Sequence, residues 1–167
     1  MRIGLIADTH GLIRPAAISA LAGCAHIVHA GDIGAPAVLE ALAAIAPVSA
    51  VRGNNDRAPW ASALPLDDVI AVGGCLLYVL HDLADLDLDP AAAGFQAVVT
   101  GHAHRPTHEI RDDVHYINPG SAGPRRFRLS ITLAELLIEE GSCLTRYQIL
   151  VFTYNADLLQ EHHRWPR

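Results

Sequence analysis

Apolar residues fall into short blocks along the chain, and in the first third shorter and longer blocks alternate. The shorter blocks predict strands, whereas the longer ones, at which Pro15 and Pro36 stand near the start, predict helices. We expect strands at 3–7, 25–30 and 48–51, and helices at 13–22 and 36–45. Three alternating strand and helix units predict a parallel sheet covered by helices, with the polar residues that follow the strands gathered at their carboxyl ends.

The rest of the chain has a different pattern, in which apolar blocks are joined by short turn sequences. Gly73-Gly74 and Asp112-Asp113 are tight hairpin signals, and residues 139–142 form a third. We expect strands at 69–72, 75–80, 97–100, 107–111, 114–117, 129–138 and 143–151. This part is therefore predicted to be mostly antiparallel β-structure.

Five short polar clusters interrupt the apolar pattern, and four of them come directly after a predicted strand. They are Asp8-Thr9-His10, Gly31-Asp32, Gly53-Asn54-Asn55-Asp56, Leu80-His81-Asp82 and Gly101-His102-Ala103-His104. Carboxylate, amide and imidazole groups are ligands of divalent metal ions. Their joint occurrence in this order predicts a split metal site, although each cluster alone is weak evidence.

Asp8 and His10 illustrate that ambiguity. Asp and His after a strand also cap helices and satisfy turns, but side chains at i and i+2 of an extended segment point the same way and can reach one cation. Asp32 follows a glycine, as in many turns, yet it lies beside Asp8 if the first two strands are neighbours. Because its carboxylate has two oxygens, Asp32 is our candidate for a bridge between two metals.

His102 and His104 form the strongest single cluster, since two imidazoles follow a strand and Gly101 admits them closely. Asn54 offers an amide oxygen, which is a serviceable donor to hard cations. His81 ends an apolar run, and its simpler interpretation is a buried histidine with a local partner.

Two other segments have less specific interpretations. His29 is either a packed polar residue or a group that orients a ligand through its ring N–H. The turn Asn118-Pro119-Gly120-Ser121 is a candidate for the rim of a pocket. The remaining histidines are expected to face solvent or to be incidental: His26, His108, His115, His162 and His163.

Composition narrows the class of protein. The 167 residues suffice for one domain, which we place at 1–153, with a polar tail at 154–167. The net charge is −6, all twelve basic residues are arginine, and the only basic cluster spans 125–128. A broad surface for nucleic acid is therefore not expected.

The spacing of the cysteines and the length of the apolar runs indicate in which cellular compartment the protein is expected. Three cysteines without C-x-x-C spacing indicate neither a disulfide framework nor a zinc ribbon. No secretory signal or membrane-spanning run is visible. We expect a cytoplasmic protein that does not enter a membrane, and a homo-oligomer is compatible with the sequence.

With these motifs in this order, the chain resembles the calcineurin-like metallophosphoesterase superfamily, whose motifs are D-x-H, G-D, G-N-H-E/D, H and G-H-x-H. The resemblance extends from Asp8 to Ser121 and looks closest to the small single-domain phosphodiesterases, which share the N-P-G-S turn. It implies an α/β fold, namely a four-layer αββα sandwich of two mixed β-sheets flanked by helices. It also implies two divalent metal ions, with Mn favoured and Fe, Zn, Ni or Mg as alternatives.

The resemblance assigns the candidate ligands to two metal sites that share one carboxylate. One metal would be held by Asp8, His10, Asp32 and His104, and the other by Asp32, Asn54, His81 and His102. Catalytic roles are implied for Asp32, Asn54 and His102.

Two positions depart from the superfamily pattern. Asn55 stands where many members have the histidine credited with protonating the leaving group, although the small phosphodiesterases also lack it. We therefore expect a preference for esters whose leaving group departs easily. Asp82 stands where a glycine commonly follows the ligand histidine, and its carboxylate either alters the affinity of the second metal or faces water.

These observations favour an enzyme that hydrolyses a small phosphodiester by attack of a metal-bound hydroxide. A hypothesis from another class is a non-catalytic scaffold, because a retromer subunit resembles these enzymes but has lost parts of the metal site. A phosphomonoesterase is a third hypothesis, and it needs arginine in the pocket. Arg57, Arg105 and Arg125 are the candidates.

Overall fold

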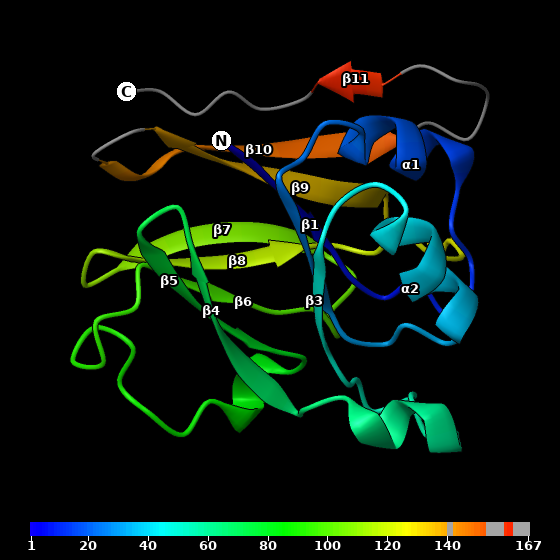
Figure 1. Ribbon diagram of the computed structural model, residues 1–167, viewed down its shortest axis with the longest axis horizontal. Coiled ribbons are helices and arrows are strands. Elements are labelled where there is room, and N and C mark those ends of the chain that lie inside the picture. Colours follow the sequence, from blue (N-terminus) through cyan, green and yellow to red (C-terminus); the bar gives the residue numbers. More distant parts are fainter. Residues whose placement is uncertain (140–141, 153–158, 162–167) are drawn as a thin grey trace.

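Two β-sheets stack face to face in the computed structural model, which describes residues 1–139, 142–152 and 159–161 (Figure 1). The first sheet has six strands in the order β11-β10-β9-β1-β2-β3. They are β1 (Arg2–Ile6), β2 (His26–Ala30), β3 (Val48–Val51), β9 (Ile131–Glu139), β10 (Ser142–Phe152) and β11 (Leu159–Glu161). β1, β2 and β3 are parallel, as the alternating pattern predicts, and β9 joins β1 in the antiparallel direction. The crossovers contain α1 (Pro15–Leu21) and α2 (Pro36–Ala43).

The second sheet has five strands in the order β4-β5-β6-β8-β7. They are β4 (Asp67–Val72), β5 (Cys75–Leu80), β6 (Ala97–Val99), β7 (Pro106–Arg111) and β8 (Val114–Pro119). The two expected hairpins form, but β6 lies between them and is parallel to both of its neighbours. The expectation of mostly antiparallel structure holds for the pairing of β9 with β10, but in this sheet two strand pairs are antiparallel and two are parallel. Turn sequences identify hairpins and carry no information about a strand that inserts between two of them.

The two largest parts of the core lie on opposite faces of the first sheet. Alternate residues of β1 point to opposite faces, so Leu5 packs between the sheets with Val79 and Val99. Ile6 packs on the other side against Leu21 of α1. The strand is therefore apolar on both faces, which is why the sequence shows it as a continuous apolar run.

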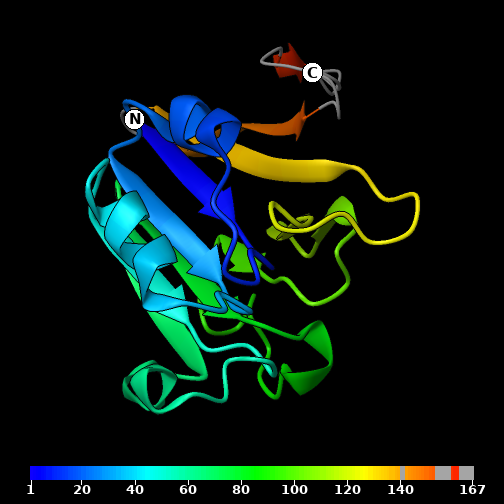
Figure 2. The same ribbon diagram turned by 90° about the vertical axis from the view of Figure 1, so that its right-hand side faces the viewer.

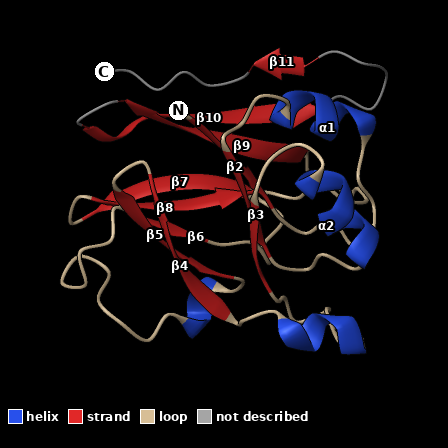
Figure 3. Ribbon diagram, in the orientation of Figure 1, coloured by secondary structure: helices blue, strands red, loops and turns tan. Residues whose placement is uncertain are grey.

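The outer face of the second sheet is covered by irregular chain. Within the described residues no α-helix lies there; instead, the 3₁₀ turn η2 (Leu83–Asp85) and the segment that follows pack Leu86, Leu88 and Phe95 against Tyr78 and Val98 (Figure 3). The sandwich of two mixed sheets implied by the resemblance is confirmed, with this thin layer in the place of the fourth. A second 3₁₀ turn that the sequence did not indicate, η1 (Pro59–Ala63), connects β3 to β4.

The structure describes only part of the tail predicted to follow the domain. Of the tail at 154–167 the structure describes Leu159–Glu161 alone, as β11, which pairs with β10. The rest of that tail, like residues 140–141 of the predicted turn, lies outside the described residues. No described helix is long and apolar enough to span a membrane.

Candidate metal centre

The predicted ligands all follow the carboxyl ends of strands, at the edge where both sheets end. They come after β1, β2 and β3 in the first sheet and after β5 and β6 in the second: Asp8, His10, Asp32, Asn54, His81, His102 and His104. Backbone hydrogen bonds continue past the strands, from Asp8 N to Gly31 O at 3.0 Å and from Gly101 N to His81 O at 2.9 Å. The loops that carry the ligands are therefore fixed to one another.

Glycines allow these loops to approach closely. A Cβ atom on Gly31 would lie 2.5 Å from Nδ1 of His81, and one on Gly53 would lie 2.2 Å from the backbone nitrogen of Asp32. Contacts of that length do not occur for real side chains, so only glycine brings Asp32 and His81 to the same place.

Left-handed backbone conformations direct most of the ligands. Five of them have φ between 46° and 65°: Asp8, His10, Asp32, His102 and His104. Such values are uncommon outside glycine and cost on the order of 1–2 kcal/mol per residue. The expectation that Asp8 and His10 converge because they are i and i+2 of an extended segment is therefore wrong in its geometry. They converge through strained turns, which cluster at functional sites.

Asp8, His10 and His104 form the first group. One ligand atom from each lies within 4.8 Å of the other two. His104 Nε2 is 3.3 Å from Asp8 Oδ1 and 3.3 Å from His10 Nε2. Burial raises the pKa of Asp8 to about 7, and burial together with the nearby Arg126 charge lowers the pKa of His104 to about 4.

Asn54, His81 and His102 form the second group, beside Asp32. The Asn54 Oδ1 atom lies 3.0 Å from His81 Nε2 and 3.2 Å from His102 Nδ1. His81 donates from Nδ1 to the Ala30 carbonyl at 2.8 Å, so the other ring nitrogen, Nε2, faces the site. Asn54 and His102 are exposed, so this side of the centre is open to a substrate.

Asp32 lies between the two groups. Its Oδ2 is 3.8 Å from His10 Nε2, and its Oδ1 is 3.5 Å from His81 Nε2. Burial alone would raise the pKa of Asp32, but hydrogen bonds that involve His81 and Asn55 outweigh burial and hold that pKa below its ordinary value. Each oxygen of an ionised carboxylate thus faces a different group of ligands, as a bridging position requires.

The donor set fits divalent cations. Both carboxylate oxygens of Asp8 are buried without a well-aligned hydrogen bond from the described residues. A buried charge in that state costs several kcal/mol unless a partner compensates it. A cation beside Asp8 would supply that compensation, and the surrounding imidazoles and carboxylates are the ligands expected for Mn, Fe, Zn or Ni.

Asn55 donates two hydrogen bonds to Asp32, a contact that no sequence pattern indicated. Its backbone N–H donates to Asp32 Oδ1 at 2.8 Å, and its side-chain Nδ2 donates to Asp32 Oδ2 at 2.6 Å. The next residue, Asp56, is buried and accepts hydrogen bonds from the backbone N–H groups of Ile33, Gly34 and Gly53. This pair of side chains joins the loop after β3 to the loop after β2.

The Asn118-Pro119-Gly120-Ser121 turn also supports the ligand loops. Ser121 Oγ donates to the Asp8 carbonyl at 2.9 Å, and Asn118 Nδ2 donates to the Gly101 carbonyl. Both side chains are buried, so the turn lies beneath the site and is not part of an exposed rim.

His29 is buried beside the site without contacting a ligand side chain. Its Nε2 lies 2.9 Å from Thr9 Oγ1, and the Thr9 hydroxyl donates to the Ile33 carbonyl. Since that hydroxyl proton is used, Nε2 of His29 is the donor. Burial lowers the pKa of His29 to about 3, so it is a neutral packing residue that anchors the segment between Asp8 and His10.

Arg126 contacts a ligand side chain, the only arginine to do so among the side chains that the structure describes. Its Nη2 is 3.2 Å from His10 Nε2. The three sequence candidates, Arg57, Arg105 and Arg125, are all exposed, and Arg57 donates from Nε to the Asn54 carbonyl at 3.0 Å. The signal for Arg126 was present as the basic cluster that follows the Asn-Pro-Gly-Ser turn.

Asp82 lies beside the second group. Its Oδ1 accepts the Ala84 N–H at the start of η2, and its Oδ2 is 3.4 Å from His102 Nε2. With Nδ1 of His102 directed toward Asn54, the opposite ring nitrogen faces this carboxylate. Of the two alternatives left open by the sequence, the geometry favours an influence on the second group.

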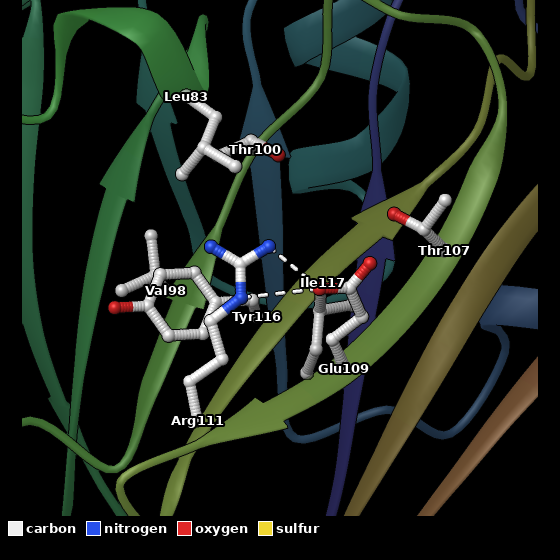
Figure 4. Close-up of a pocket in the computed structure, with 8 residues that line it drawn as sticks. All are labelled: Leu83, Val98, Thr100, Thr107, Glu109, Arg111, Tyr116 and Ile117. Atoms are coloured by element: carbon white, nitrogen blue, oxygen red, sulfur yellow. Dashed lines mark hydrogen bonds and ion pairs between the residues drawn. The ribbon is translucent and has the colours of Figure 1, made fainter.

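A hollow on the outer face of the second sheet is separate from this centre. It measures about 60 Å³, and its lining includes Thr107, Glu109, Arg111 and Tyr116 (Figure 4). Arg111 pairs with Glu109 at 2.6 Å and lies over the Tyr116 ring. Because its charges are paired with each other and its volume is far below that of a typical ligand pocket, we assign it no function.

The chain is similar to known phosphoesterases. Residues 1–141 match the model of the calcineurin-like phosphoesterase superfamily domain. A probable metallophosphoesterase of Methanothermobacter thermautotrophicus is 30% identical over 133 residues, which cover 72% of this chain and 77% of that protein.

Two solved structures show the same fold. An archaeal phosphodiesterase is 23% identical, with a TM-score of 0.75, and the match covers 91% of this chain and 100% of the other. Vacuolar Protein Sorting 29 from Cryptosporidium parvum is 16% identical, with a TM-score of 0.77 and coverage of 96% and 95%. Enzymes and proteins named for sorting therefore share this architecture.

Proposed function

Because the chain belongs to the calcineurin-like phosphoesterase superfamily, we propose that it is a dinuclear-metal-dependent phosphodiesterase that hydrolyses a small phosphodiester. The observation that carries the proposal is the convergence of a complete ligand set around Asp8, whose buried carboxylate lacks an aligned donor. An archaeal phosphodiesterase of the same fold supports the diester as substrate.

Two divalent ions, preferably Mn, would be held at this centre. The first would be held by Asp8, His10, Asp32 and His104, and the second by Asp32, Asn54, His81 and His102. When bound, the ions supply Lewis acidity, which lowers the pKa of a water molecule and offsets charge on the phosphoryl group.

The side chains of this protein contribute orientation. Asn55 fixes both oxygens of Asp32, and Ala30 fixes the tautomer of His81. Asn55 has no titratable proton, so the leaving group departs as a stable anion or takes its proton from water. We therefore expect the enzyme to favour esters with acidic leaving groups.

A scaffold without activity is the second candidate, because Vacuolar Protein Sorting 29 has the same fold. A protein that had lost metal binding would have no reason to retain seven ligand-type residues in strained or closely packed positions. The retained set favours the enzyme.

Metal content and turnover test the proposal. The protein purified with Mn should bind two ions per chain and hydrolyse bis(p-nitrophenyl) phosphate, and chelation should abolish the activity. Asp32→Asn should lose about 10²-fold or more in kcat/KM, since it removes the shared charge, whereas Asp89→Asn on the exposed surface should not. A folded wild-type protein that takes up no metal and shows no turnover would support the scaffold.

A further inference from the structure

The connection between β8 and β9 presents an unusual group of side chains beside the metal centre. We call residues 122–130 the arginine loop, since they include Arg125, Arg126 and Arg128 around Phe127. In Figure 2 this connection, in yellow, stands out beside the carboxyl end of β1. It is thus one of the segments within reach of a molecule bound at the centre.

The base of the arginine loop is fixed to the centre. Ser121 pairs with Ile131, and Thr132 N donates to the Ser121 carbonyl at 2.9 Å, which closes the loop. A Cβ atom on Gly123 would lie 2.4 Å from the Asp8 carbonyl oxygen, so the loop begins in close contact with the Asp8 backbone. The position of the loop is therefore set by the same residues that set the ligands.

The arginines of this loop have donors available for an anion. Arg126 Nη2 is 3.2 Å from His10 Nε2, at the first ligand group. In the part of the chain that the structure describes, none of the three forms an ion pair with a carboxylate. A guanidinium offers five N–H donors in a fork that matches phosphate oxygens, and one contact with His10 leaves most of them unused.

Phe127 is the most exposed large apolar residue described, with 93% of its surface accessible. Its φ is 52°, a conformation that disfavours a side chain of this size. Neither feature stabilises the fold, because Phe127 buries very little of its surface and its backbone is strained. An exposed aromatic ring flanked by arginines is typical of surfaces that stack on a base while they hold a phosphate.

We propose that the arginine loop recognises the nucleoside part of a nucleotide phosphodiester, with Phe127 stacked on the base and Arg126 on the phosphate. This assignment rests on the proposed function and names its substrate class. One aromatic ring on a chain of net charge −6 suits a single nucleotide unit better than a long nucleic-acid strand.

Two esters with the same leaving group test the assignment. Thymidine 5′-(p-nitrophenyl phosphate) and ethyl p-nitrophenyl phosphate differ only in the group that Phe127 would contact. The Mn-loaded wild type should prefer the thymidine ester, and Phe127→Ala should reduce that ratio of kcat/KM values about tenfold. Phe127→Trp should keep the preference. Ile110→Ala, which removes another exposed apolar side chain on β7, should also keep it.

A binding measurement supplies a second readout. Calorimetry with adenosine 5′-monophosphate should give a Kd about tenfold weaker for Phe127→Ala than for wild type. Arg126→Ala should weaken binding of both this nucleotide and inorganic phosphate, whereas Phe127→Ala should weaken binding of the nucleotide alone.

The outcomes separate the two proposals. Hydrolysis of both esters with an unchanged ratio in Phe127→Ala would overturn nucleoside recognition and leave the phosphodiesterase intact. If the metal-loaded protein hydrolyses neither ester, the proposed function fails. Calorimetry then tests the role of the loop, and equal nucleotide binding by wild type and Phe127→Ala would overturn that assignment. An oligothymidylate hydrolysed far faster than the thymidine ester would contradict recognition of a single nucleotide.

Discussion

Asn55 contacts the bridging candidate Asp32 through its backbone and its side chain. Hydrogen bonds to an ionised carboxylate are about twice as strong as those between neutral groups, so this contact fixes the orientation of both oxygens. Asn55 therefore does more than stand where many members of the superfamily have a histidine acid, because it orients a candidate ligand. Replacing a residue that orients a ligand typically costs about 10- to 100-fold in metal affinity.

Asn55→Ala should weaken Mn binding about 10- to 100-fold, because Asp32 Oδ2 loses its donor while the backbone contact to Oδ1 stays. Calorimetric titration of Mn into metal-free protein measures the change. Ser62→Ala, which removes an exposed hydroxyl from η1, is the control and should bind Mn as wild type does. Affinity within twofold of wild type for Asn55→Ala would contradict the role.

Asp82→Asn should weaken the second Mn equivalent about tenfold, since it removes the charge 3.4 Å from His102 Nε2 and keeps an acceptor for Ala84 N. Asp89 provides a matched control, because it caps Ala91 and Ala92 in the same manner without a nearby imidazole. The measurement is again calorimetric, and equal second-site affinity in both variants would show that Asp82 only caps η2.

The loops after the strands are held by buried polar side chains. Asp56 accepts three backbone hydrogen bonds, which join the segment after β2 to the segment after β3. These contacts offset part of the strain of the left-handed residues nearby, such as Asp32. The ligands are thus positioned by a network of hydrogen-bonded loops, to a greater extent than by the strands that precede them.

Asp56→Ala should reduce the free energy of unfolding by about 3 kcal/mol, because three buried N–H groups lose a charged acceptor. Urea denaturation of metal-free protein measures the loss, and Asp85→Ala on the exposed face of η2 is the control. A loss below about 1 kcal/mol would mean that water replaces these contacts.

The candidate centre joins both sheets of the molecule. Asp8, Asp32 and Asn54 follow strands of the first sheet, whereas His81 and His102 follow strands of the second. An ion held by both sets would bind only the folded arrangement, so metal binding and folding are linked.

Each Mn site filled at 100 times its Kd should therefore stabilise the protein by about 2.7 kcal/mol. For a domain of this size that corresponds to a rise in Tm of roughly 5 to 10 °C, which differential scanning calorimetry measures. Addition of EDTA should reverse the rise, and Asp8→Asn should show little of it. An unchanged Tm in the presence of Mn would indicate that the site does not hold the ion.

The strand and helix pattern of the first third was readable because each unit is a local apolar block. The parallel arrangement of β1, β2 and β3 agrees with that interpretation. In contrast, the insertion of β6 between two hairpins depends on its pairing with β5 and β8, to which it is joined by longer connections than a tight turn. Local periodicity does not encode such pairings.

The sequence by itself determined which residues can ligate a metal and that they follow strands, since side-chain chemistry and apolar periodicity are local properties. Only the tertiary structure decided that His102 faces Asn54 while His104 faces Asp8, although the two histidines are two residues apart. It also decided that Arg126 reaches His10. These outcomes depend on left-handed turns and on loops packed across both sheets, and such packing is a property of the folded chain as a whole.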